Sequence, residues 1–333
     1  MFKIFWYLLA LVVISALLTG VYFSMDYFFN QQVVTVGLKW KHQAQFAGMY
    51  VAKDLGYYRR SGLDVNFKEL SFDSNSIDDL ISGKLDFLLI SPEEFILHIN
   101  DGKDIKAVAS FYQVSPYVIV SLTKSDIKDP GDFIGKTLGV KGGKLEEEII
   151  YLLLLKKFGI STDDVEIKKI GFNKTELNDL LDGDVDTIGL YRTDQLYFFD
   201  KNFIDYNIIY PENFGINVTN DLLVTRGNLV EQDPKLVRNF VQNSIKGWKY
   251  AIDNIDQAVK ITLDYIRDEN YQDQEYQKYI LTNSIPLIKT GTSQPIGLIS
   301  SSNLNNLYKD IKLNYSIESD LDISYFYSNN FVR

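Results

Sequence analysis

The chain has 333 residues, 46% of them hydrophobic, which is enough to bury a large core and predicts two globular units. Its 44 acidic residues outnumber its 34 basic residues, so no nucleic acid is expected as a partner. The lack of cysteine excludes disulfides, thiolate metal sites, a cysteine nucleophile and a lipid-modified cysteine, and only two histidines remain. We therefore expect no cofactor, no metal and no enzymatic activity.

The N-terminal segment is strongly apolar. Residues 4–25 contain no charged side chain, and a helix of that length spans the ~30 Å hydrocarbon layer of a bilayer. We expect residues 1–32 to form an uncleaved anchor with its linker, residues 4–25 to lie in the cell membrane, and the rest to be extracytoplasmic. A cleaved secretory peptide is the alternative, because Ala16 and Gly20 are small residues near the end of the segment.

Beyond the linker, short apolar strands alternate with amphipathic helices, which is the pattern of parallel βαβ units. Strands are predicted at 33–38, 63–70, 87–90 and 107–111, and helices at 47–55, at 77–81 and from Pro92 onward. The continuously apolar segment 87–90 is typical of a strand buried on both faces. Pro92 favours a helix start, because proline is tolerated in the first turn.

A second α/β block begins near Lys124. Strands are predicted at 137–140, 165–170 and 187–190, helices at 145–158 and 175–181, and a returning strand at 222–225. Beyond Pro234 the chain is expected to be mainly helical, with an apolar core stripe at 236–251. No internal sequence repeat stands out, which argues against solenoid and propeller folds.

The segment from Leu38 to Val65 reads LKWKHQAQFAGMYVAKDLGYYRRSGLDV. It resembles the opening of aminopyrimidine-binding proteins of the thiamine-pyrimidine-synthase-like, or SsuA-like, family of ABC-transporter solute-binding proteins. Shorter similar phrases occur at 83–87, 122–139, 186–193 and 220–225. The resemblance implies the type II periplasmic-binding-protein fold, in which two crossing strands join two α/β lobes around a ligand. We expect residues 33–122 and 221–333 to form lobe one, and 123–220 to form lobe two.

Polar residues after the predicted strands are the candidate ligand contacts, because ligands of open α/β sheets bind beyond the carboxyl ends of strands and at helix N-termini. Trp40 follows the first strand and offers an aromatic face for a flat heterocycle. Polar side chains next to it could supply directed hydrogen bonds, and they belong to His42, Gln43 and Gln45. The alternative is that Trp40 belongs to the core and the glutamines are solvated.

Further candidates follow other strands. Ser91 and Glu93 come after segment 87–90, where helix capping and a helix-dipole role are the alternatives. An acidic first turn at 146–148 argues mildly against anionic ligands. The remaining candidates lie in the second block or beside the second crossing, and they are Gly142, Gly143, Tyr191, Arg192, Thr193, Asn217 and Asp221.

The resemblance implies a binding protein that delivers a small polar heterocycle, such as a thiamine-precursor pyrimidine, to an ABC permease. A ligand-sensing protein that acts with a membrane signalling partner is the alternative. Pyrimidine synthases of the same family need a lysine, a nearby histidine and a cysteine-rich segment. The corresponding positions hold Ile90, Glu93 and Glu94, and residues 214–219 contain no cysteine, so that chemistry is not expected here.

Overall fold

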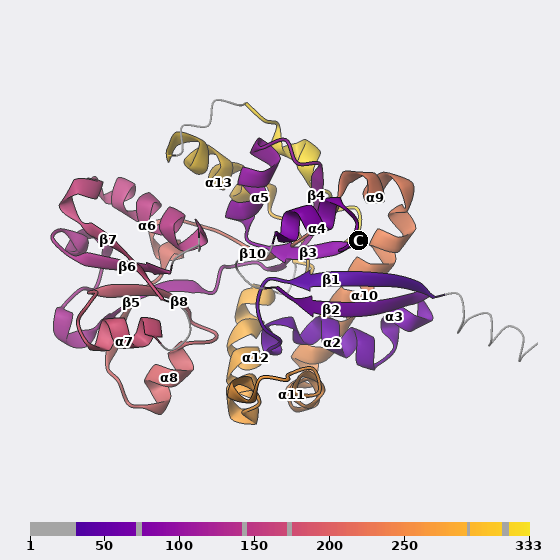
Figure 1. Ribbon diagram of the computed structural model, residues 1–333, viewed down its shortest axis with the longest axis horizontal. Helices are drawn as coiled ribbons and strands as arrows, with labels where there is room; N and C mark the ends of the chain where they lie inside the picture. The colour runs from indigo at the N-terminus through magenta and orange to yellow at the C-terminus, as the bar shows by residue number, and fades with distance from the viewer. Residues whose placement is uncertain (1–30, 71–74, 142–144, 172–174, 292–293, 315–319) are drawn as a thin grey trace, which may run out of the picture.

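The computed structural model describes residues 31–70, 75–141, 145–171, 175–291, 294–314 and 320–333. The expected membrane segment 4–25, together with Gly142 and Gly143, lies outside these residues. No helix within the described ranges is both long and apolar enough to cross a bilayer. Two sheets with their covering helices lie side by side, and we call them the first and the second lobe (Figure 1).

The first lobe contains a five-stranded sheet in the order β2-β1-β3-β10-β4. Strands β1, β2 and β3 are parallel, as the βαβ pattern predicted, whereas β10 runs antiparallel to β3 and β4. The strand predicted to be buried on both faces is confirmed, because every residue of β3 is buried. The bounds are β1 Gln32–Leu38, β2 Leu63–Glu69, β3 Phe87–Ile90, β4 Ile105–Tyr112 and β10 Asn220–Arg226.

The second lobe repeats this plan in the order β7-β6-β8-β5-β9. Here β6 is parallel to β7 and β8, and β5 is antiparallel to β8 and β9. Residues 117–122, which the sequence analysis grouped with lobe one, thus pair within the second sheet. The bounds are β5 Tyr117–Leu122, β6 Thr137–Lys141, β7 Glu166–Ile170, β8 Thr187–Tyr191 and β9 Tyr206–Ile209.

Helices cover both sheets, and the C-terminal part is mainly helical, as expected. Helices α6, α7 and α8 belong to the second lobe, and α13 packs against both α5 and α6. The bounds are α2 Ala47–Asp54, α3 Tyr57–Arg60, α4 Ser76–Ile81, α5 Pro92–Asn100, α6 Leu145–Phe158, α7 Thr175–Leu181, α8 Leu196–Lys201, α9 Gly227–Gln232, α10 Pro234–Asp253, α11 Ile255–Leu263, α12 Gln274–Ile288 and α13 Ser301–Asn314.

The two lobes share a local hydrogen-bond motif that the sequence analysis did not detect. In the first lobe the backbone N–H of Thr35 donates to the carboxylate of Asp86 over 2.9 Å. In the second lobe the N–H of Thr137 donates to Asp186 over 2.8 Å. Each aspartate also donates its own N–H to the carbonyl of the same threonine. Each aspartate directly precedes the middle strand of its sheet, so the motif ties the start of β3 to β1 and the start of β8 to β6.

Helices α2 and α10 cross closely below the first sheet. A Cβ atom on Gly247 of α10 would lie 1.9 Å from the carbonyl oxygen of Gly48 in α2, so only glycine fits there. Trp248, next along α10, is 1% exposed and packs in the same core. This contact holds α2 and therefore the short 3-10 helix Ala44–Phe46 that precedes it, which carries residues of the cleft.

Candidate ligand-binding site

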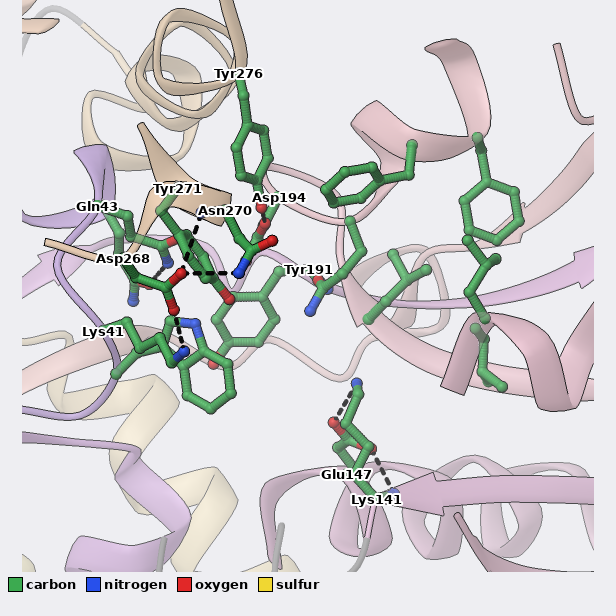
Figure 2. Close-up of a pocket in the computed structure, with 18 of the residues that line it drawn as sticks. Lys41, Gln43, Lys141, Glu147, Tyr191, Asp194, Asp268, Asn270, Tyr271 and Tyr276 are labelled. Atoms are coloured by element: carbon green, nitrogen blue, oxygen red, sulfur yellow. Dashed lines mark hydrogen bonds and ion pairs between the residues drawn. The ribbon is translucent and has the colours of Figure 1, made fainter. Parts of the chain in front are cut away.

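A cavity of about 570 Å³ lies between the two lobes. Five segments surround it: the loop after β1, the end of β6 with the start of α6, helix α7, the strand β8 with helix α8, and the segment that leads into α12. Figure 2 shows Asp194, Tyr276 and Tyr271 from two of these segments close together, with Lys141 and Glu147 across the space from them. The polar lining residues are Lys39, Lys41, Gln43, Gln45, Lys141, Glu147, Asn178, Tyr191, Asp194, Gln195, Asn202, Asp268, Asn270, Tyr271 and Tyr276. Trp40 lines the cavity as well.

A chain of amides fixes the orientation of Gln43. The Nε2 of Gln45 donates to both carboxylate oxygens of Asp221, at 2.8 and 3.0 Å, so the Oε1 of Gln45 must be an acceptor. It accepts a hydrogen bond of 2.8 Å from the Nε2 of Gln43. The remaining atom, Oε1 of Gln43, is buried and has no hydrogen-bond partner among the described residues. Gln43 therefore carries a buried, unpartnered hydrogen-bond acceptor in the wall of the cavity.

Asp194 is a buried acid on the wall of the cavity. Its carboxylate accepts a hydrogen bond from the hydroxyl of Tyr276. Burial raises the pKa of Asp194 to about 6, although the Tyr276 hydrogen bond, the charge of Lys141 and the Gln43 amide act in the opposite direction. Near neutral pH this carboxyl can therefore either accept a hydrogen bond or carry a proton.

The three lysines that line the cavity each form a salt bridge. The distances from Nζ to carboxylate oxygen are 3.4 Å for Lys39–Asp221, 2.5 Å for Lys41–Asp268 and 2.9 Å for Lys141–Glu147. An anionic ligand would have to compete with these carboxylates. Asp194, by contrast, has no ion-pair partner in the described part of the chain. The lining thus favours a neutral or cationic ligand that carries hydrogen-bond donors.

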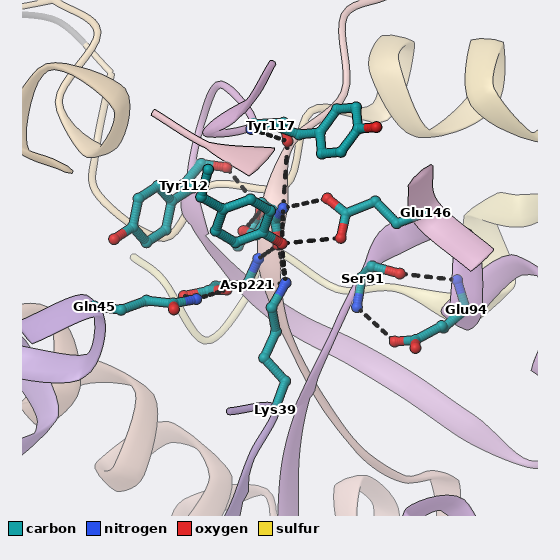
Figure 3. Close-up of polar contacts among 12 residues, drawn as sticks. Lys39, Gln45, Ser91, Glu94, Tyr112, Tyr117, Glu146 and Asp221 are labelled. Carbon is teal, nitrogen blue, oxygen red and sulfur yellow. Dashed lines mark hydrogen bonds and ion pairs between the residues drawn. The ribbon is translucent and has the colours of Figure 1, made fainter. Parts of the chain in front are cut away.

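A buried polar network joins the lobes behind the cavity (Figure 3). The Nζ of Lys39, from the first lobe, donates to the hydroxyl of Tyr191 in the second lobe over 2.9 Å. That hydroxyl donates to Glu146 over 2.9 Å, and the amide of Asn220 donates to the same carboxylate over 2.7 Å. Burial would lower the pKa of Lys39, but the charges of Glu146 and then Asp221 outweigh it and raise the pKa. Lys39 is therefore a permanent cation that links the lobes.

Several predicted contacts lie outside the cavity lining. The ring of His42 hydrogen-bonds the hydroxyl of the buried Tyr50 over 2.7 Å, and burial lowers its pKa. Ser91 caps helix α5, because its hydroxyl accepts from the backbone N–H of Glu94 while that glutamate accepts from the backbone of Ser91. Glu93 is fully buried, and neither of its carboxylate oxygens has a hydrogen-bond partner among the described residues. Burial, followed by the charge of Glu146, raises its pKa well above the usual range.

The candidates of the second block divide in the same way. Tyr191 lines the cavity, and Asp221 holds the amide chain and Lys39. Arg192 turns away toward the crossing segments, where it pairs with Glu212 over 2.8 Å. Thr193 is buried outside the lining, and Asn217 is exposed to solvent. The structure thus gathers Trp40, Gln43, Gln45, Tyr191 and Asp221 around the cleft. Six other candidates lie outside the cavity lining, and they are His42, Ser91, Glu93, Arg192, Thr193 and Asn217.

Some lining residues were missed by the sequence analysis. Asp194 directly follows the predicted cluster that ends at Thr193, and Lys141 directly follows the strand predicted at 137–140, so the rule about carboxyl ends of strands could have found both. Tyr271 and Tyr276 lie more than two hundred residues after the first cleft loop, and no local pattern marks them as ligand contacts. Only the folding of α12 against the first loop, through a 2.7 Å hydrogen bond from the backbone of Ala44 to Gln277, brings them there.

The sequence profile of the NMT1/THI5-like family matches residues 43–258, which is more than half of the chain. The riboflavin-binding protein RibY of Chloroflexus aurantiacus is 25% identical over 270 residues, which cover 80% of this chain and 76% of that protein. A formylaminopyrimidine-binding protein of Halalkalibacterium halodurans is 24% identical over 246 residues, 72% of each chain. The periplasmic aliphatic sulphonate-binding protein SsuA of Escherichia coli has a TM-score of 0.69 at 13% identity, covering 88% of this chain and 91% of that chain. That likeness confirms the expected periplasmic-binding-protein fold of the two lobes.

Proposed function

Because the chain belongs to the NMT1/THI5-like family, as the segment from Leu38 to Val65 indicated, we propose that it is an extracytoplasmic solute-binding protein. Its lobes close around a small polar heterocycle, which it then delivers to an ABC permease. Residues 4–25 hold it at the membrane. The cavity lined from both lobes supports this proposal, since contacts from two sides favour the closed state by their differential free energy.

The ligand carries an amino group beside a ring nitrogen, as a 4-aminopyrimidine does. One observation carries this proposal: the Oε1 of Gln43 is a buried acceptor with no partner among the described residues. The Gln43 amide cannot be flipped to put its NH₂ group there, because its Nε2 already donates to the Oε1 of Gln45. An exocyclic amino group satisfies it. The neighbouring Asp194 then shares a proton with the ring nitrogen, which a carboxyl with a pKa of about 6 can do in either protonation state. Trp40 supplies a stacking face.

Delivery rather than catalysis fits the residues of the cleft. The position that corresponds to the lysine of pyrimidine synthases is Ile90, whose side chain is buried in the core of the first lobe. Each lysine that lines the cavity forms a salt bridge with a carboxylate, so its Nζ is not presented as an attacking amine for a Schiff base. A sensing role alongside a membrane signalling partner stays the alternative, and affinity capture from membranes, recovering either a permease or a kinase, distinguishes the two.

Calorimetric titration of the full chain tests the ligand class. We expect 2-methyl-4-aminopyrimidine to bind at least tenfold more tightly than its 4-oxo analogue, since the oxo group places an acceptor against the acceptor of Gln43. Gln43→Leu removes this acceptor and should weaken binding of the amino compound about tenfold, or ~1.4 kcal/mol. Gln257→Leu, at an exposed position of α11, is the control. Equal affinity for both compounds, or full affinity in Gln43→Leu, contradicts the proposal.

A further inference from the structure

His42 lies in the loop after β1 that carries cleft residues, but its own side chain does not line the cavity. Trp40 before it and Gln43 after it do line the cavity. Gln43 has an extended backbone, with φ −163° and ψ 174°. Because successive side chains of an extended segment point to opposite sides, the side that His42 takes decides the side that Gln43 takes.

Two hydrogen bonds hold His42 on the side away from the cavity. Its backbone N–H donates to the carboxylate of Glu69, at the end of β2, over 2.6 Å. Its Nδ1 forms a hydrogen bond of 2.7 Å with the hydroxyl of Tyr50 in α2. The backbone N–H of Ala44 is held as well, by a hydrogen bond of 2.7 Å to a side chain of α12. The chain is thus fixed on both sides of Gln43.

The hydroxyl of Tyr50 is a rigid anchor for the loop. The side chain of Tyr50 is 0% exposed. Its ring stacks on Tyr265, with the ring centroids 4.3 Å apart and the planes at 14°, and it meets Phe67 edge-on at 5.3 Å. Tyr50 therefore cannot follow the loop when His42 moves away from it.

The contact between His42 and Tyr50 depends on the protonation state of the imidazole. The backbone N–H of Gln43 acts as a donor toward the same hydroxyl. The hydroxyl oxygen can accept there while its own proton goes to Nδ1 of a neutral imidazole. In the imidazolium form Nδ1 carries a proton and accepts nothing. The buried hydroxyl proton of Tyr50 then has no acceptor left among the described residues, which is costly.

The groups that surround His42 leave it neutral at neutral pH. Burial lowers its pKa, the carboxylate of Glu69 raises it, and the charge of Arg267 lowers it further, with a net decrease from 6.5. The rings of Tyr50 and Tyr265 also face the imidazole, with centroids at 5.5 and 6.1 Å. Burial raises the pKa of both tyrosines, so neither carries a charge there.

We propose that His42 is a positioning residue of the binding site. Neutral His42 ties the loop to Tyr50 and so turns Gln43 toward the ligand, whereas protonation of His42 breaks this tie and weakens binding. The inference rests on the proposed function and adds a pH dependence to it: the protein holds its ligand at neutral pH and releases it as the medium becomes acidic.

Calorimetric titration of the full chain with 2-methyl-4-aminopyrimidine at pH 7.5 and pH 5 tests this role. In His42→Asn the Oδ1 can accept the proton of the Tyr50 hydroxyl, but the side chain does not ionise. We expect this variant to bind as tightly as wild type at pH 7.5 and about fivefold more tightly than wild type at pH 5. Ionisation of Asp194 and of the compound is common to both proteins, so it cancels in the ratio of their affinities.

Two further variants complete the test. His98→Asn replaces the other histidine of the chain, which lies on α5 outside the cavity lining, and should match wild type at both pH values. His42→Leu removes the acceptor and should bind about fivefold more weakly than His42→Asn at pH 7.5. Tyr50→Phe, which removes the donor, takes its place if His42→Leu does not fold.

The outcomes separate this inference from the proposed function. If wild type binds the compound and its affinity relative to His42→Asn is the same at both pH values, the role of His42 is refuted and the proposed function stands. Equal affinities of His42→Leu and His42→Asn at pH 7.5 refute it as well. If wild type does not bind the compound, the proposed function fails and the role of His42 falls with it.

Discussion

Replacing Asp194 by asparagine should make the unliganded protein more stable at neutral pH. The wild-type carboxyl is only 5% exposed, has no ion-pair partner in the described part of the chain and is held by the hydroxyl of Tyr276. Asparagine has nearly the same shape, and its Oδ1 can still accept that hydrogen bond, but it carries no charge to desolvate. The substitution thus tests whether the charge of Asp194 serves ligand binding at the expense of the stability of the folded protein.

The magnitude follows from the pKa of Asp194. Burial raises this pKa from 3.8 to about 6, which corresponds to ~3 kcal/mol at ~1.36 kcal/mol for each tenfold change. Between these two values the native protein retains a proton that the unfolded chain has released, so the free energy of unfolding decreases as the pH rises. Below pH 3.8 both states are protonated and the effect vanishes. The advantage of Asp194→Asn should therefore increase from near zero at pH 4 to about 3 kcal/mol at pH 7.5 and above.

Urea unfolding, followed by circular dichroism at a series of pH values, measures this difference. Asp64→Asn, at an exposed position of β2, is the control and should change the free energy of unfolding by less than ~0.5 kcal/mol. Asp194→Asn should also bind 2-methyl-4-aminopyrimidine more weakly than the wild-type protein. A stability difference between Asp194→Asn and wild type that does not change with pH refutes the reasoning, because it means that ionisation of Asp194 is not what costs stability.

Two further substitutions test the framework of the site. Gly247→Ala places a Cβ atom 1.9 Å from a backbone oxygen of α2, and should lower the free energy of unfolding by about 2 kcal/mol, whereas Gly291→Ala has no atom within 4 Å of its Cβ and should be neutral in the same denaturant titration. Lys39→Met leaves the carboxylate of Asp221 buried without its cation and should cost ~3–5 kcal/mol. Lys41→Met breaks a salt bridge whose lysine side chain is 39% exposed, and should lower the free energy of unfolding by no more than ~1 kcal/mol. Thermal melts in which the two lysine variants lose equal stability contradict this distinction.

The sequence predicted local elements well, because their signals are local. The run of four apolar residues at 87–90 and Pro92 after it marked β3 and the start of α5 at the observed residues. The mixed pairing of each sheet was harder to predict. Strand β9 is only partly buried along most of its length, so its sequence gives a weak strand signal. The antiparallel pairing of β5 and β10 depends on where the chain crosses between the lobes, which no local pattern shows.

The candidate site was predicted where it follows a strand and missed where it depends on tertiary contacts. Trp40 and Gln43 were found because they directly follow β1. His42 lies in the same loop but points to Tyr50, and a residue list cannot reveal on which side of a loop a side chain lies. Tyr276 reaches the cavity only because α12 packs on the first lobe.

Asp221 has a further consequence for how the protein works. It stands where the chain re-enters the first sheet, with a left-handed φ of 49°, and it holds both Lys39 and the amide of Gln45. Asp221 and Gln45 both belong to the first lobe, whereas Lys39 also donates to Tyr191 of the second lobe, so a rotation of the lobes would change the Lys39–Tyr191 contact and leave the Asp221–Gln45 contact in place. The amide chain from Asp221 through Gln45 to Gln43 is therefore carried by one lobe alone, and its arrangement does not depend on how the two lobes are set against each other.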